Sequence, residues 1–361
     1  MYMLRVGMLT SGGDCQALNV AMRGVAKTLY KNCDDVSIFG FLDGYKGLIK
    51  KNYKLLKKDD FAGILTKGGT ILGTSRTPFK YINMPDEDGN DKVQSMINTY
   101  KELQLDCLVV LGGNGSHKTA NLLSENGLNI VTLPKTIDND LYGTDMSFGF
   151  QSAIDIASNT IDCIHTTAAS HSRVFIVELM GHKTGWLTLY AGIAGGADII
   201  LIPEIPYKME LIINAISKRT QEGKHFTIIA VAEGAISQEE ALLTKKKLKE
   251  LRASEAGKYP SVAYKIGDKI TELCGHEVRV TVPGHVQRGG QPNAYDRVLA
   301  TRLGVKAAEL IMAGKYGYMP CVKNNQIDII PISEVAGKTR KVDPQSDVVL
   351  QARQLGLCLG D

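Results

Sequence analysis

Short apolar runs alternate with amphipathic segments along the whole chain. Runs rich in β-branched and aliphatic residues are typical of buried strands, and apolar residues three and four apart are typical of helices. The predicted strands cover residues 4–9, 36–41, 108–111, 129–133, 173–180, 199–202, 226–232 and 279–283, and the predicted helices cover 17–30 and 151–167. Strands and helices alternate, and the pattern restarts near residue 170. We therefore predict an α/β fold of two similar Rossmann-like lobes with mainly parallel sheets and an active-site cleft between them.

The composition favours a globular, cytoplasmic protein. Of the 361 residues, 44% are hydrophobic and 22% are charged, and a net charge of +4 gives no reason to expect nucleic acid as a partner. The basic cluster at 245–252 has helical spacing, and we interpret it as a solvated helix face. No apolar run reaches the ~18–20 residues of a membrane span, and no signal peptide precedes the first strand. Seven scattered cysteines indicate reduced thiols.

Three glycine-rich loops follow or precede these elements, at residues 10–14, 68–76 and 112–116. A strand followed by a glycine turn and a helix presents bare backbone N–H groups to an anion. One such turn is a weak signal, but three together predict phosphate binding. No G-x-G-x-x-G follows the first strand, which makes a dinucleotide-dependent oxidoreductase a poor alternative.

Two carboxylates stand two residues apart directly after the strand 129–133. Asp138 and Asp140 belong to the run Pro-Lys-Thr-Ile-Asp-Asn-Asp at 134–140. In open parallel sheets ligands bind at the carboxyl ends of the strands. A carboxylate loop beside a phosphate-type turn is suited to phosphoryl transfer.

Six segments together carry a family resemblance. In order they are 9–14, 112–116, 134–140, 170–173, 180–181 and 283–290. They resemble the 6-phosphofructokinase family, close to mixed-type bacterial members that use ATP or pyrophosphate. The resemblance implies a larger, donor-binding lobe at 1–149 and about 286–336. It also implies a smaller, fructose-6-phosphate-binding lobe at 150–285 and about 337–361.

The resemblance implies transfer of a phosphoryl group to the 1-hydroxyl of fructose 6-phosphate. Asp138 matches the general base of the family, with Asp140, Thr136 and Lys135 as the other catalytic residues. The residues that match the sugar site are Arg173, Met180, Gly181, His182, Glu233, Arg279, His285 and Arg288. Those that match the donor site are Gly13, Arg76, Thr77, Gly113, Asn114, Gly115 and Ser116. In this family the phosphate-binding arginines reach across from a neighbouring subunit, so we expect a homo-oligomer, a dimer or tetramer, with shared active sites.

Three positions bear on the donor and its metal. Asn114 stands where many members have a magnesium-binding Asp, so we expect only a weak Mg²⁺ contact there, through phosphates and water. Gly115 leaves room for the α-phosphate of ATP, whereas Lys135 is common in pyrophosphate-dependent members. Because an added carboxylate would exclude ATP and an added Lys would not, we expect ATP as the donor, with pyrophosphate as the alternative. A non-catalytic sugar-phosphate-binding paralogue is the other alternative, supported by Asn114 alone.

Overall fold

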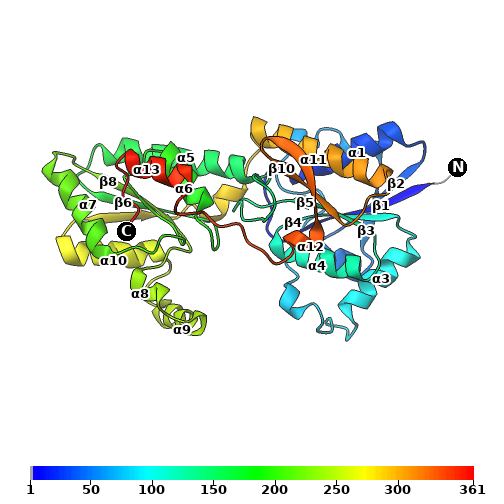
Figure 1. Ribbon diagram of the computed structural model, residues 1–361, viewed down its shortest axis with the longest axis horizontal. Coiled ribbons are helices and arrows are strands. Elements are labelled where there is room, and N and C mark those ends of the chain that lie inside the picture. Colours follow the sequence, from blue (N-terminus) through cyan, green and yellow to red (C-terminus); the bar gives the residue numbers. More distant parts are fainter. Residues whose placement is uncertain (1–2) are drawn as a thin grey trace. The chain divides into compact units, whose positions relative to one another are not determined.

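The computed structural model describes residues 3–361, and their contacts divide the chain into two compact units. Unit 1 runs to Ser152 and resumes over Arg288–Arg340. Unit 2 consists of Ala153–Gln287 and Lys341–Asp361. Each unit contains a mainly or wholly parallel sheet with helices on both faces (Figure 1), which confirms the predicted α/β class.

Unit 1 is built on a seven-stranded sheet in the order β11-β10-β5-β4-β1-β2-β3. Its strands are β1 (Leu4–Ser11), β2 (Val36–Phe41), β3 (Tyr53–Leu56), β4 (Cys107–Gly112), β5 (Ile130–Pro134), β10 (Tyr318–Lys323) and β11 (Gln326–Pro331). The pairs β2–β3 and β10–β11 are antiparallel, and the other pairs are parallel. All residues of β4 and β5 are buried, as the continuous apolar runs predict for strands covered on both faces.

The helices of unit 1 cover both faces of this sheet. They are α1 (Leu18–Asn32), α2 (Tyr45–Ile49), α3 (Lys92–Glu102), α4 (Asn114–Glu125), α11 (Ala294–Met312) and α12 (Ile332–Val335), with the 3₁₀ turns η1 (Lys58–Phe61), η2 (Ile64–Thr66) and η3 (Phe79–Tyr81). Figure 1 shows α1 and α11 side by side on one face. A Cβ at Gly24 would lie 2.9 Å from the carbonyl oxygen of Thr301, so glycine permits this close crossing.

Unit 2 has a four-stranded parallel sheet in the order β7-β8-β6-β9. The strands are β6 (Val174–Leu179), β7 (Ile199–Leu201), β8 (Thr227–Ala232) and β9 (Val278–Thr281). The helices are α5 (Phe150–Ala168), α6 (Trp186–Ala194), α7 (Met209–Gln221), α8 (Gln238–Ala241), α9 (Lys245–Glu255), α10 (Val262–Cys274) and α13 (Asp347–Gln354). Helix α5 begins three residues before unit 2, and η4 (Gly284–Arg288) ends one residue after its first part.

Most predicted elements agree with the structure to within about two residues. The predictions of a turn at 10–11 and of a loop over 112–116 are wrong, because Thr10 and Ser11 continue β1, Gly112 ends β4, and α4 begins at Asn114. Helix α9 has no buried residue, which confirms that its lysines lie on a solvated face. All seven cysteines are free. Among residues 3–361, no helix combines the length and hydrophobicity needed to cross a bilayer.

Candidate active site

The carboxyl ends of three central strands meet at one edge of the unit 1 sheet. Ser11 of β1 pairs with Gly112 of β4, and Gly112 pairs with Pro134 of β5. The segments that follow them therefore start next to one another: the turn at 12–14, Gly113 with the start of α4, and the loop at 135–140. This is the edge at which open parallel sheets bind their ligands.

The glycine-rich loop at 68–76 lies against the turn at 12–14. The N–H of Gly12 donates to the carbonyl of Ser75 (3.1 Å), and the hydroxyl of Thr74 donates to the carbonyl of Gly12 (2.7 Å). Gly12 has φ +85°, a left-handed conformation that favours glycine. Arg76 is exposed and Thr77 is half-buried directly after this contact. The structure thus brings the three glycine loops together.

Two cations flank the turn at 12–14. The buried ammonium of Lys135 donates to the carbonyl of Gly13, and Nη1 of Arg288 donates to the carbonyl of Asp14 (2.9 Å). Burial lowers the pKa of Lys135, and the charge of Arg288 lowers it further, while the carboxylates of Asp138 and Asp140 oppose the shift. Two positive charges therefore lie at the turn at 12–14, and Lys135 itself begins the carboxylate loop, a setting that attracts phosphate.

The carboxylate loop is held in shape by Asn139, which has φ +50°. Asn tolerates this left-handed conformation better than most residues. Its Oδ1 accepts the N–H of Ser147 (2.9 Å), and the Ser147 hydroxyl donates to the carbonyl of Thr136 (2.8 Å). The N–H of Asp138 donates to Oγ1 of Thr136 (3.0 Å). These bonds fix the backbone on both sides of Asp138, whose side chain is half-buried, as is that of Asp140.

Helix α4 starts directly after Gly113, within the glycine-rich segment 112–116. Gly113 is its N-cap and supplies no side-chain cap, so the first N–H groups of the helix keep their capacity to donate. A Cβ at Gly112 would overlap the side chain of Ser116, which makes glycine necessary there. Gly115 is exposed, and a Cβ built on it would meet no atom within 4 Å. The start of α4 can therefore receive an anion.

Asn114, the first residue of α4, is held at both ends of its carboxamide. Its Nδ2 donates to the carbonyl of Lys338 (2.7 Å) and to Oγ1 of Thr339 (3.2 Å), and its Oδ1 accepts the N–H of Gly337 (3.1 Å). Within residues 3–361, no three His, Cys, Asp or Glu side chains gather in a way that could hold a metal ion.

A second group of predicted residues gathers at the carboxyl ends of β6 and β8 in unit 2. The N–H of His182 donates to Oε1 of Glu233 (2.8 Å), and the N–H of Glu233 donates to the carbonyl of Leu179 (2.9 Å). Gly181 has φ +146° and His182 has φ +54°, so the chain turns sharply here. A Cβ at Gly181 would lie 2.5 Å from the carbonyl of Thr184, which excludes a larger residue. The backbone of the 180–182 turn therefore contacts the Glu233 carboxylate through the N–H of His182.

Arg173 and Arg279, the two arginines predicted to bind a phosphate, share one carboxylate. Both guanidinium groups form ion pairs with Glu277, and the hydrogen bond from Arg173 is the main cause of its lowered pKa. Arg173 forms its ion pair through Nε. The side chains of Arg173, Arg279 and Glu277 are half-exposed or exposed. His285, in η4, is exposed. Arg173, Arg279 and His285 are therefore accessible to a ligand that arrives from solvent.

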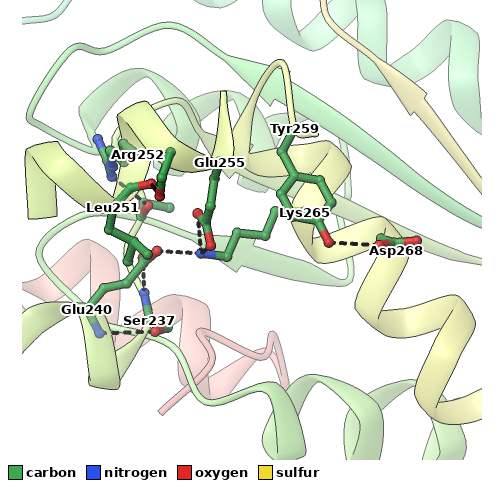
Figure 2. Close-up of polar contacts among 10 residues, drawn as sticks. Ser237, Glu240, Leu251, Arg252, Glu255, Tyr259, Lys265 and Asp268 are labelled. Carbon is green, nitrogen blue, oxygen red and sulfur yellow. Dashed lines mark hydrogen bonds and ion pairs between the residues drawn. The ribbon is translucent and has the colours of Figure 1, made fainter. Parts of the chain in front are cut away.

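A cavity of about 220 Å³ opens beside Glu233 and reaches under α9. Its polar lining includes Glu233, Glu240, Arg252, Glu255, Tyr259 and Lys265. Figure 2 shows the Lys265 ammonium between the carboxylates of Glu240 and Glu255, each 2.8 Å away. Burial disfavours the charge of Lys265, but its hydrogen bonds to the two carboxylates prevail and raise its pKa. The lysine thereby ties α10 to α8 and α9.

Sequence reasoning missed two features of these sites. Gln287 is buried, and its Oε1 accepts the N–H of Met180 (3.3 Å). The predicted boundary near 336 assigned 337–340 to the smaller lobe, but the hydrogen bonds of this segment attach it to α4 and to the carboxylate loop in unit 1. No local signal marks either feature, because both depend on residues more than 100 positions away.

Comparison with known proteins identifies relatives of this chain. The family model described as Phosphofructokinase matches residues 5–311. A protein of Spirochaeta thermophila named ATP-dependent 6-phosphofructokinase is 53% identical over 98% of this chain and 97% of its own length. One of Bacteroides thetaiotaomicron, named ATP-dependent 6-phosphofructokinase 3, is 44% identical over 99% of this chain and 100% of its own.

A solved phosphofructokinase of Saccharomyces cerevisiae has a similar structure, with a TM-score of 0.78 and 31% identity. The match covers 92% of this chain but 45% of the yeast chain, so the present chain corresponds to less than half of that protein. The family model and the full-length relatives both cover most of the residues described above. The chain therefore belongs to the phosphofructokinase family.

Proposed function

We propose that this protein is an ATP-dependent 6-phosphofructokinase that converts fructose 6-phosphate to fructose 1,6-bisphosphate. The observation that carries the proposal is the convergence of three glycine turns, two cations and the Asp138 loop at one sheet edge. Full-length relatives named ATP-dependent 6-phosphofructokinase support the substrate and the donor.

Asp138 acts as the general base in this proposal. Its carboxylate takes the proton of the sugar 1-hydroxyl while that oxygen attacks the γ-phosphorus, and the bond to the β-phosphate oxygen breaks to release ADP. Such a base contributes about 10²–10⁴-fold. Lys135 and the start of α4 bind the donor phosphates and offset the developing charge, which supplies most of the remaining rate enhancement.

Mg²⁺ is the expected metal, and the chain offers it few ligands. Asp138 or Asp140 would hold it through water, which fits an ion that takes most of its ligands from phosphates and water. When bound, Mg²⁺ neutralises charge on the donor phosphates. Asn114 is expected to be a weak metal contact, but its carboxamide already makes three hydrogen bonds, which compete with binding of a metal ion.

Unit 2 supplies most of the sugar-binding residues in this proposal. The Glu233 carboxylate accepts hydrogen bonds from sugar hydroxyls, beside the turn that contains Met180, Gly181 and His182. Arg173 and Arg279 bind the 6-phosphate, because guanidinium groups match its paired oxygens, and His285 and Arg288 contact the sugar. We further propose that the protein is a homo-oligomer in which Arg173 and Arg279 serve a neighbouring subunit.

Gly115 favours ATP over pyrophosphate as the donor. It is exposed with open space around it, so an α-phosphate could lie there without meeting a side chain. Lys135 favours pyrophosphate, since it adds a cation beside the donor site. A cation attracts either donor, whereas a carboxylate at 115 would reject ATP, so the glycine carries more weight.

The decisive experiment is a donor exchange with a matched pair of variants. Wild type is assayed with fructose 6-phosphate and either ATP or pyrophosphate, alongside Gly115→Asp and Gly115→Ala. We expect ATP turnover by wild type and by the Ala variant, and about 100-fold or greater loss with the Asp variant. Turnover with pyrophosphate alone, unaffected by Gly115→Asp, would establish the alternative donor.

Asp138→Asn separates an enzyme from a non-catalytic binding protein. The amide preserves the size of the side chain but cannot accept the proton. We expect kcat to fall by about 10³-fold while the dissociation constant of fructose 6-phosphate changes little. Binding without turnover in the wild type itself would favour the non-catalytic paralogue.

A further inference from the structure

Asn114 joins two parts of unit 1 that are far apart in the sequence. Its three hydrogen bonds all go to residues 337–339, and each end of the carboxamide takes part. The carbonyl of Lys338 can only accept, and the N–H of Gly337 can only donate. A partner for both must carry a donor and an acceptor on one short side chain, which is the property of asparagine.

The same short stretch also holds the carboxylate loop. The N–H of Arg340 donates to the carbonyl of Asp140 (2.8 Å), and Thr339 forms an isolated β-bridge with Leu141. Nη1 of Arg340 lies 3.4 Å from the carbonyl of Asn139, to which it donates. The 337–340 segment is therefore bonded to α4 on one side and to the residues following Asp138 on the other.

Two further features restrain this segment. Gly337 has φ +85°, a conformation that other residues rarely adopt. The ammonium of Lys338 lies 5.0 Å from the ring centroid of Tyr142, a cation–π contact just beyond the carboxylate loop. The conformation of the segment is therefore restrained at Gly337 and at Lys338.

We propose that Asn114 is a positioning residue and not a metal ligand. It fastens the 337–340 segment to the start of α4, and through that segment it fixes the Asp138–Asp140 loop relative to the turn that binds the donor phosphates. This inference rests on the proposed function of the two turns. Because phosphoryl transfer depends on the alignment of base, acceptor and phosphate, loosening this connection lowers kcat more than it weakens donor binding.

Replacement by aspartate distinguishes the two roles most sharply. A carboxylate cannot donate to Lys338, and it would set a negative charge against a carbonyl oxygen. For a positioning residue, Asn114→Asp is therefore as harmful as Asn114→Ala. For a metal ligand, Asn114→Asp is an improvement, because Mg²⁺ prefers carboxylate oxygen.

The test compares Asn114→Ala, Asn114→Asp and the control Asn121→Ala, which removes a bond from Asn121 to Glu125 on the same helix. Steady-state kinetics gives kcat and KM for both substrates over a range of Mg²⁺, and calorimetry gives the affinity for ATP. Hydrogen exchange with mass spectrometry follows the peptide that contains the amides of Gly337 and Arg340.

We expect both Asn114 variants to lose about 10- to 100-fold in kcat, with the dissociation constant of ATP within about threefold of wild type. The Mg²⁺ concentration at half-maximal rate stays unchanged, and exchange at 337–340 accelerates about tenfold or more. The control behaves like wild type in each measurement.

Two results would overturn the inference. One is an Asn114→Asp variant that needs less Mg²⁺ or turns over faster than wild type. The other is an Asn114→Ala variant with unchanged kcat and unchanged exchange. If wild type shows no turnover with ATP, the proposed function fails, and the exchange measurement still decides whether Asn114 fastens the segment.

Discussion

A side chain at position 13 would occupy the space that the Arg288 guanidinium fills. The nearest neighbour of a Cβ built on Gly13 is Nη1 of Arg288, which also donates to the carbonyl of Asp14 (2.9 Å). The glycine turn after β1 and the arginine at the end of η4 thus fit together only when residue 13 has no side chain. This packing places a fixed guanidinium beside the predicted donor site.

Gly13→Ala should therefore displace Arg288 and impair catalysis. We expect kcat to fall by about 100-fold, because a shift of about 1 Å in a charged group beside a reacting phosphate costs that much. Steady-state kinetics measures the loss, and circular dichroism checks that the fold persists. Gly257→Ala is the control, since a Cβ at Gly257 meets no atom within 4 Å. Activity of Gly13→Ala equal to that of the control would contradict the role of this packing.

Because His117 is buried, we expect the protein to lose stability in acid. Its Nδ1 lies 2.8 Å from the carbonyl of Gly113 and so carries the hydrogen, and burial is the main cause that lowers its pKa from 6.5 to about 4. The unfolded chain takes up this proton below pH 6.5, whereas the folded chain resists until about pH 4. The stabilising contribution is complete above pH 6.5 and is lost as the pH falls toward 4, to a total of about 3 kcal/mol.

His117→Asn removes this proton uptake while keeping an N–H donor near Gly113. Urea unfolding at several pH values should show a shallower dependence on pH between 6.5 and 4 for the variant than for wild type. The absolute stability of the variant is not the readout, because the smaller side chain also leaves a cavity. Parallel curves for the two proteins would show that His117 does not titrate in this range.

We expect the ion pairs of Lys265 to hold α9 in place. Lys265→Met removes two ion pairs and leaves the carboxylates of Glu240 and Glu255 without their cation (Figure 2). Since α9 buries none of its residues, we expect it to detach, at a cost of about 1–3 kcal/mol for a half-buried group. Limited proteolysis should cut this helix faster. Lys246→Met is the matched control, because its pairing with Glu250 spans 4.0 Å on the surface.

We expect Glu277 to weaken the affinity for fructose 6-phosphate. It pairs with both Arg173 and Arg279, so under the proposed function it would compete with the 6-phosphate for the same guanidinium groups. Glu277→Gln should lower the KM of fructose 6-phosphate by about two- to fivefold, a modest effect because the pairs are half-exposed to exposed. The gain should shrink at high salt, where surface charges are screened. A higher KM in the variant would mean that Glu277 orients the arginines instead.

The sequence by itself determined the class of fold and the family. Apolar runs such as 108–111 predicted strands because residues buried on both faces of a parallel sheet must be apolar throughout. The glycine turns and the Asp138 loop were visible because a phosphate-binding turn and a carboxylate after a strand are local patterns. The family resemblance, confirmed by the comparisons, followed from the same segments.

Only the tertiary structure decided which distant groups meet. Arg288 lies against Gly13, Gln287 accepts the N–H of Met180, and the 337–340 segment links Asn114 to Asp140. Each contact joins residues that are more than 100 positions apart, and no short-range spacing encodes it. The amide of Asn114 suggested a weakened metal ligand in the sequence, whereas its three hydrogen bonds became visible only once the chain had folded back on α4. Local patterns fix strands and turns, but the register of the sheet and the packing of the chain decide which side chains share a site.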